Sequence, residues 1–246
     1  MKRFKFWYIP ALFFIVACAL NLAGCLTEGE LERIMKPSLM PLLCVATLAY
    51  LLESASAEGL AAGPEGQARA RRGAVLLTAG QLFGFAGDTM LMGKGFVFFA
   101  GGIALFLIGH LFYISLIGGE SWKGLGPGRW ALATGGMLAA CCGLVLGIGV
   151  NGTMLAPMGI YGLVLTLLIF SALAGVLRPE KRLSGSNSTW WILLCGAVLF
   201  TFSDALIAVR NFGELSPFMS GFGVMSTYLL AQSLLAVGGA RLILRK

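Results

Sequence analysis

The sequence predicts an all-α membrane protein with eight transmembrane helices, and three observations predict it: composition, apolar runs and the placement of cations. Of the 246 residues, 58% are hydrophobic and 12% are charged, whereas soluble domains carry about 25% charged residues. Mean hydropathy is +0.86. Runs near the ~20 residues needed to cross a bilayer recur along the chain. They lack the alternation of barrel strands, so helices are expected, because lipid admits only helices or closed barrels.

The eight runs are predicted to form a single integral membrane domain over residues 1–246. In chain order they cover 5–26, 37–54, 73–93, 95–118, 129–150, 154–177, 190–210 and 216–240. The Ala/Gly-rich segment from Ser54 to Arg72 is predicted to be a flexible cytoplasmic connector. The first run ends in Leu22-Ala23-Gly24-Cys25, which resembles a bacterial lipoprotein signal. Such a short string of small residues arises easily by chance, so the run is counted as a span.

The lysines and arginines predict the topology. With the N-terminus in the cytoplasm, 14 of the 18 cations fall in inner segments, and the four in outer segments are Arg33, Lys36, Lys94 and Arg210. This split follows the positive-inside rule, so both termini are predicted to be cytoplasmic in a multi-pass protein of the cell membrane. The net charge of +7 then reflects topology and contact with membrane lipids. No nucleic-acid partner is expected, since no basic patch is interleaved with exposed aromatics.

The only two aspartates, Asp88 and Asp204, lie inside the third and seventh runs. An ionised carboxylate in hydrocarbon costs roughly 2.5–3.5 kcal/mol on insertion scales, which favours a functional role over a buried pair kept for architecture. Asp88 lies six residues before Lys94, and Asp204 lies six residues before Arg210. At 1.5 Å per residue, each carboxylate is expected about 9 Å below the outer end of its helix. The two carboxylates are therefore predicted to share a depth.

The sequences before the two aspartates are also alike. Leu82-Phe83-Gly84-Phe85-Ala86-Gly87-Asp88 resembles Leu199-Phe200-Thr201-Phe202-Ser203-Asp204. The two runs are four spans apart, an even number, so both cross the membrane in the same direction. The similarity indicates a 4+4 pseudo-repeat of parallel four-helix units, although Phe/Gly-rich spans look alike by composition alone.

Other polar side chains fall where they could converge with the aspartates. Gln81 and Asp88 share one helical face with Gly84, and Phe106, His110 and Tyr113 share another. The predicted substrate-binding residues are Lys36, Gln81, His110, Tyr113, Tyr161, Ser203, Tyr228 and Gln232. The alternative for His110 is a structural hydrogen bond between helices, and for the tyrosines it is packing. Lys36, Lys94 and Arg210 could hold a phosphate or serve as topology-setting cations.

Several chemistries have no basis in the sequence. There is one histidine, and the six cysteines show no metal-type spacing, so no metal site is expected and the cysteines are interpreted as packing residues. No Gly-x-Gly-x-x-Gly or P-loop occurs, and no cofactor is expected. No Gly-x-Ser-x-Gly occurs either, which leaves His110 without an evident nucleophile partner.

Several motifs, in order over nearly the whole chain, resemble those of the YhhN or lysoplasmalogenase family. Gly80-Gln81-Leu82-Phe83-Gly84-Phe85-Ala86-Gly87-Asp88-Thr89-Met90-Leu91 is similar to the family's Phe-Ser-x-x-Gly-Asp-x-x-Leu motif. Gly109-His110-Leu111-Phe112-Tyr113 resembles its Gly-His-x-x-Tyr element. The stretch from Gly196 to Leu206 resembles its Gly-Ala-x-x-Phe-x-x-Ser-Asp-x-x-Leu block. Lys36-Pro37 and Tyr228-Leu229-Leu230-Ala231-Gln232 match two further elements. Gly84 departs from the pattern, which often has Ser there.

The resemblance implies an eight-helix hydrolase of the vinyl ether bond of lysoplasmalogens, which releases a fatty aldehyde and a glycerophospho-base. Asp88 and Asp204 would then be the catalytic pair, one protonated as the acid and one ionised to orient water. Burial and a neighbouring like charge both favour a protonated carboxyl, but the sequence leaves open which aspartate is the acid. It also leaves open the head group, choline or ethanolamine, and the oligomeric state.

Two alternatives use the same scaffold. Paired intramembrane carboxylates in a 4+4 repeat also suit a proton-coupled transporter of a small molecule. A non-catalytic lipid-binding membrane protein is the third hypothesis. The aspartates lie toward one face of the membrane and the third run contains no proline, and both features favour the hydrolase over the transporter.

Overall fold

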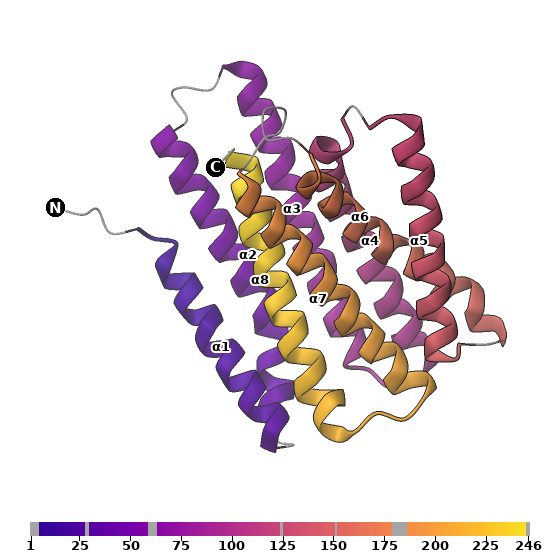
Figure 1. The fold of residues 1–246 in the computed structure, drawn as a ribbon. Coiled ribbons are helices and arrows are strands. Elements are labelled where there is room, and N and C mark those ends of the chain that lie inside the picture. The colour runs from indigo at the N-terminus through magenta and orange to yellow at the C-terminus, as the bar shows by residue number, and fades with distance from the viewer. Residues whose placement is uncertain are drawn as a thin grey trace. The chain divides into compact units, whose positions relative to one another are not determined.

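The computed structural model describes residues 5–27, 30–58, 63–123, 125–150, 152–178 and 186–244. Within these ranges, eight helices are long and apolar enough to cross a membrane, which confirms the predicted fold class. They are α1 (Tyr8–Thr27), α2 (Glu30–Glu58), α3 (Pro64–Leu91), α4 (Phe96–Ser121), α5 (Pro127–Ile148), α6 (Leu155–Val176), α7 (Asn187–Phe212) and α8 (Val224–Leu244) (Figure 1). A 3-10 turn, η1 (Gly152–Met154), precedes α6, and a π-helical segment, η3 (Met219–Gly223), precedes α8. The chain is a multi-pass membrane protein.

Helices α2 and α3 begin well before the apolar runs that predicted them. Helix α2 begins at Glu30 and continues through Pro37 and Pro41, because nearby polar groups can re-satisfy the backbone that a proline frees in a membrane helix. Helix α3 begins at Pro64, so most of the segment expected to be a flexible connector is helical. Proline suits the first helical position, and the Ala/Arg/Gln-rich stretch after it has high helix propensity.

Six of the cations used for the topology lie outside the described residues: Lys2, Arg3, Lys181, Arg182, Arg245 and Lys246. Asn151, which the predicted topology puts in the outer loop between the fifth and sixth runs, also lies outside them.

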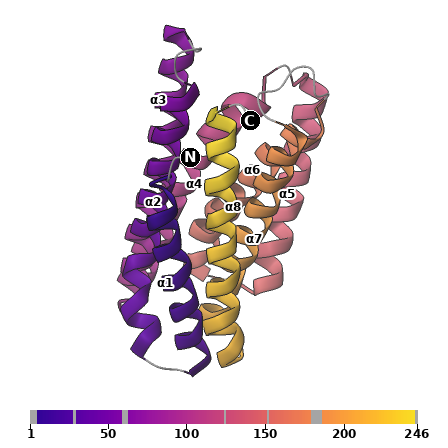
Figure 2. The ribbon, with the colours of Figure 1, turned by 90° about the vertical axis from the view of Figure 1, so that its left-hand side faces the viewer.

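The helices gather in two compact units, of which the first comprises residues 1–116 and 236–246. Helices α1 and α2 lie side by side in both views (Figures 1 and 2). Asn21 donates a hydrogen bond from Nδ2 to the Glu32 carbonyl at 3.0 Å. The C-terminal end of α8 packs on α3, where a methyl group added to Gly239 would come within 2.9 Å of Leu77. This unit contains Asp88.

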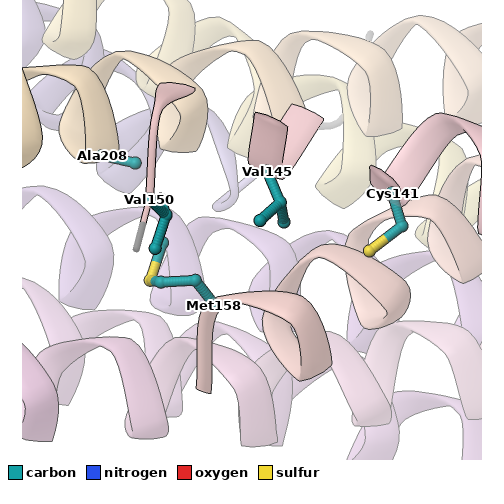
Figure 3. Packing of buried hydrophobic residues seen from close by; sticks show 5 residues of the cluster. All are labelled: Cys141, Val145, Val150, Met158 and Ala208. Carbon is teal, nitrogen blue, oxygen red and sulfur yellow. The ribbon is translucent and has the colours of Figure 1, made fainter. Parts of the chain in front are cut away.

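The second unit comprises residues 117–235, with α5, α6, α7 and the first part of α8. Helix α6 packs against both α5 and α7. Gly149 ends α5 in the left-handed conformation, at φ 76°, which glycine adopts without steric cost. The chain then brings Val150 back over the helix ends, where it joins a buried cluster with Cys141, Val145, Met158 and Ala208 (Figure 3). This unit contains Asp204.

Candidate functional site

Asp204 and Tyr161 are joined by a hydrogen bond between α7 and α6. The Tyr161 hydroxyl donates to Oδ2 of Asp204. Their side chains are 4% and 2% exposed, respectively. In hydrocarbon a buried carboxyl group is costly unless it is hydrogen-bonded. The Tyr161 hydroxyl supplies Asp204 with such a hydrogen-bond donor.

The Asp204 pocket, as we call it, is formed by α5, α6 and α7 beside this pair. The pocket is partly open, and the volume of about 350 Å³ not filled by protein atoms includes space outside its walls. It is lined by Leu144, Val145, Ile148, Val150, Met158, Tyr161, Gly162, Leu165, Thr201, Asp204, Ala205 and Ala208. Thr201 turns its hydroxyl back to the Ala197 carbonyl at 2.9 Å. Asp204 and Tyr161 are therefore the polar side chains that the pocket can present to a ligand.

Three predicted site residues of the second unit, on α7 and α8, make side-chain contacts. Ser203 donates to the Val224 carbonyl at 3.1 Å, which ties α7 to α8. Gln232 Nε2 donates to the Tyr228 hydroxyl at 3.3 Å, and the Tyr228 ring lies edge-on to Phe200 with 5.5 Å between ring centroids. All three predicted residues are buried. Their predicted role in substrate binding stays a prediction.

In the first unit, α3 and α4 both carry buried polar side chains, and Asp88 of α3 is one of them. Asp88 is 4% exposed, and Gln81, His110 and Tyr113 are buried as well. Glycines let the two helices approach closely. A methyl group on Gly80 would come within 2.7 Å of the Tyr113 ring, and glycine at such positions is the usual route to close helix contact in lipid. The two helical faces that the spacing predicted, one on α3 and one on α4, are therefore both buried.

Hydrogen bonds fix two of these side chains. Gln81 donates from Nε2 to the Thr47 hydroxyl at 3.0 Å, and Thr47 donates in turn to the Leu43 carbonyl at 2.7 Å. His110 Nδ1 lies 2.6 Å from the Phe106 carbonyl. A carbonyl can only accept, so Nδ1 is the donor, and Nε2 of the neutral ring is the acceptor.

The predicted phosphate ligands occupy more exposed positions. Lys36 is half-buried on α2, whereas Lys94, just after α3, and Arg210, in the last turn of α7, are exposed. Lys36 and Lys94 belong to the first unit, and Arg210 to the second. No group of three or more His, Cys, Asp or Glu side chains suited to a metal ion occurs among the described residues.

Sequence reasoning missed Thr47 and the small residues Gly162, Ala205 and Ala208 that shape the Asp204 pocket. It named Tyr161 and Asp204 separately and did not pair them. Their similar predicted depth was a usable signal. Tyr161 lies seven residues into a run predicted to start on the outer side, and Asp204 lies six residues before Arg210.

The chain is similar to a protein family and to named relatives. The model of the YhhN family matches residues 31–239, which leaves α1 outside the match. Human "Lysoplasmalogenase TMEM86A" is 30% identical over 169 residues, 67% of this chain and 65% of the relative. Mouse "Lysoplasmalogenase TMEM86B" is 32% identical over 63% of this chain and 59% of the relative. The rat "Lysoplasmalogenase TMEM86B" is 28% identical over 96% and 84%, respectively. The matches thus span less than two thirds of the human and mouse relatives. No solved structure matches.

Proposed function

The chain belongs to the YhhN family, and we propose from this premise that it is a lysoplasmalogenase. The proposed reaction is hydrolysis of the vinyl ether bond of a single-chain ether lysophospholipid. The products are a fatty aldehyde and a glycerophospho-base with choline or ethanolamine. The names of the human, mouse and rat relatives support this substrate class.

The observation that carries the proposal is the buried Asp204 carboxyl with its Tyr161 partner at an apolar pocket. Vinyl ether hydrolysis passes through an oxocarbenium ion, so it needs a proton donor and an anion that steadies the cation. A carboxylate that accepts a hydroxyl hydrogen bond is favoured as an anion. We therefore assign the ionised role to Asp204 and the acid role to Asp88.

The proposed reaction begins with proton transfer from Asp88 to the substrate. Asp88 donates its proton to the chain-side carbon of the double bond, and positive charge develops on the carbon bonded to the ether oxygen. Asp204 stabilises that charge and takes a proton from a water as the water's oxygen adds to the same carbon. The hemiacetal hydroxyl then transfers its proton to the glycerol oxygen as the bond between the carbon and that oxygen breaks. The glycerophospho-base leaves as an alcohol, and the same carbon becomes the aldehyde carbonyl. Proton transfer from Asp204 back to Asp88 restores the starting state.

We propose further that Asp88 and Asp204 act on one substrate molecule. The support comes from the sequence: the equal six-residue offsets from Lys94 and Arg210 and the similar flanking residues. Both aspartates are buried at 4% exposure, as a pair shielded from water requires. Lys36, Lys94 and Arg210 are the proposed partners of the lipid phosphate, because charge-assisted hydrogen bonds suit phosphate oxygens.

The aldehyde assay tests this function directly. Detergent-purified protein is incubated with a lysoplasmalogen and, separately, with an ester lysophospholipid, and both aldehyde and fatty acid are measured. Aldehyde from the vinyl ether substrate alone is expected, and it is expected to persist in chelator. Fatty acid alone would make the protein an esterase, and neither product would favour the transporter or lipid-binding hypothesis.

The proposed location is the cell membrane, with both termini in the cytoplasm. A cysteine-free protein with single cysteines at Asn151, Ser216 or Gly126 tests the orientation. An impermeant thiol reagent added to intact cells is expected to label positions 151 and 216, whereas position 126 is expected to react only after permeabilisation. Labelling of position 151 from the cytoplasmic side alone would overturn the topology.

A further inference from the structure

We propose that the Asp204 pocket holds the hydrocarbon chain of the substrate next to the vinyl ether, an inference that rests on the proposed function. The pocket lies wholly within the second unit, between α5, α6 and α7. Its position follows from the chemistry, because the double bond that reacts is the first bond of the chain itself. A carboxylate that steadies charge on the ether-bonded carbon must lie beside the first carbons of that chain.

The character of the lining fits a hydrocarbon and disfavours the head group. Leu144, Val145 and Ile148 of α5 and Met158 and Leu165 of α6 give it aliphatic walls. No lysine or arginine lines it among the described residues, so a lipid phosphate would find no counter-charge there. The carboxyl of Asp204 would also repel a phosphate. An apolar chain with one reactive carbon suits this lining, because the chain can contact the aliphatic walls while the reactive carbon lies near the Asp204 carboxyl.

Small residues on α6 and α7 leave space in the Asp204 pocket for a hydrocarbon chain. Ala205 lies directly after Asp204, and Ala208 lies one turn further along the same helix. Gly162 follows Tyr161 on α6, and a methyl group there would lie 3.0 Å from the Cys141 sulfur. A longer side chain at position 162 or 208 would therefore crowd neighbouring atoms. Ala205 is half-buried, so a longer side chain there can extend into the pocket with less strain.

The buried cluster limits how far a chain can extend on one side. Val150 and Met158 line the pocket where α5 ends and α6 begins, and Figure 3 shows the Met158 side chain extending to Val150. From Thr201 to Ala208 the lining extends over eight residues of α7, a length of about 10 Å. A four-carbon chain fits within this length and a sixteen-carbon chain extends beyond it, so a side chain that shortens the pocket should affect the long chain more.

The test is the chain-length preference of Ala205→Leu. Aldehyde release is measured with lysoplasmalogens whose alkenyl chains have four or sixteen carbons, and the two values of kcat/KM are divided. The ratio of long-chain to short-chain kcat/KM is expected to fall by about tenfold, since a methylene that no longer fits a pocket changes kcat/KM by that order. The matched control is Ala140→Leu, the same substitution at an exposed position of α5, which is expected to keep the wild-type ratio.

The possible results distinguish a failure of the subsite proposal from a failure of the proposed function. An unchanged ratio in a folded Ala205→Leu protein, or an equal loss for both chains, would overturn the subsite while the function stands. Failure of the wild-type protein to release aldehyde from either substrate would overturn the function. If Ala205→Leu does not fold, Leu144→Ala gives the second test. It widens the pocket and is expected to raise relative turnover of a chain bearing a phenyl group near the double bond, and no change in that preference would also overturn the subsite.

Discussion

Asp88→Asn and Asp204→Asn are each expected to lower kcat for aldehyde release by about 100- to 10,000-fold, the range that positioned acid–base groups contribute. Asparagine keeps the shape and hydrogen-bonding capacity of aspartate but cannot exchange the proton or carry the charge. Both side chains are buried, so solvent is a poor substitute for either. The measurement is steady-state aldehyde release by detergent-purified variants, with melting temperature recorded for each.

The double variant distinguishes a shared catalytic step from two structural roles. Groups that act in one step are non-additive, so the double variant is expected to be no slower than the slower single variant. Glu214→Gln is the control, because it makes the same change at an exposed carboxyl after α7, and it is expected to keep wild-type kcat. A well-folded single variant with near-wild-type kcat would contradict the two-carboxylate mechanism.

The fold was largely predictable because hydrophobicity alone determines which segments cross a membrane. All eight spans follow from apolar runs. The misplaced helix starts share a physical cause. Residues Glu30–Lys36 of α2 and the arginine-rich first turns of α3 are polar, so a hydropathy argument assigns them to loops although their helix propensity is high. Hydropathy locates the hydrocarbon boundary, and a helix can extend beyond it into water.

The candidate site was predictable in its residues but not in its pairings. Burial of Gln81, Asp88, His110 and Tyr113 follows from helical periodicity, which gives each side chain a face and a depth. Which neighbouring helix that face meets depends on rotation and packing. The bond from Gln81 to Thr47 therefore could not be obtained from spacing within one helix. The 4+4 pseudo-repeat stays a prediction for the same reason, since it concerns how helices far apart in the sequence correspond.

Tyr161→Phe is expected to shift the pH–rate profile in a way that a structural defect would not. The variant removes the hydroxyl that donates to Asp204 and leaves the ring in place. A hydrogen bond to a charged group is worth about 1.5–3 kcal/mol, so the ionised form of Asp204 should lose stabilisation by a factor of roughly 10 to 150. Because the proposed mechanism needs Asp204 to be ionised, the acidic limb of the profile is expected to move to higher pH. The loss of kcat should then be largest at low pH and shrink as pH rises.

Thr166→Val is the matched control for this shift. It removes a buried hydroxyl from the same helix, and that hydroxyl donates to the Leu163 carbonyl at 3.0 Å rather than to Asp204. Tyr161 is the one titratable neighbour that faces Asp204 among the described residues lining the pocket, so Thr166→Val should leave the profile in place even if it lowers the melting temperature. If Tyr161→Phe lowered kcat equally at every pH, Tyr161 would be a packing residue, and the assignment of the ionised role to Asp204 would lose its support. A shift in the alkaline limb instead would reverse the roles, with Asp204 as the acid and Asp88 as the anion.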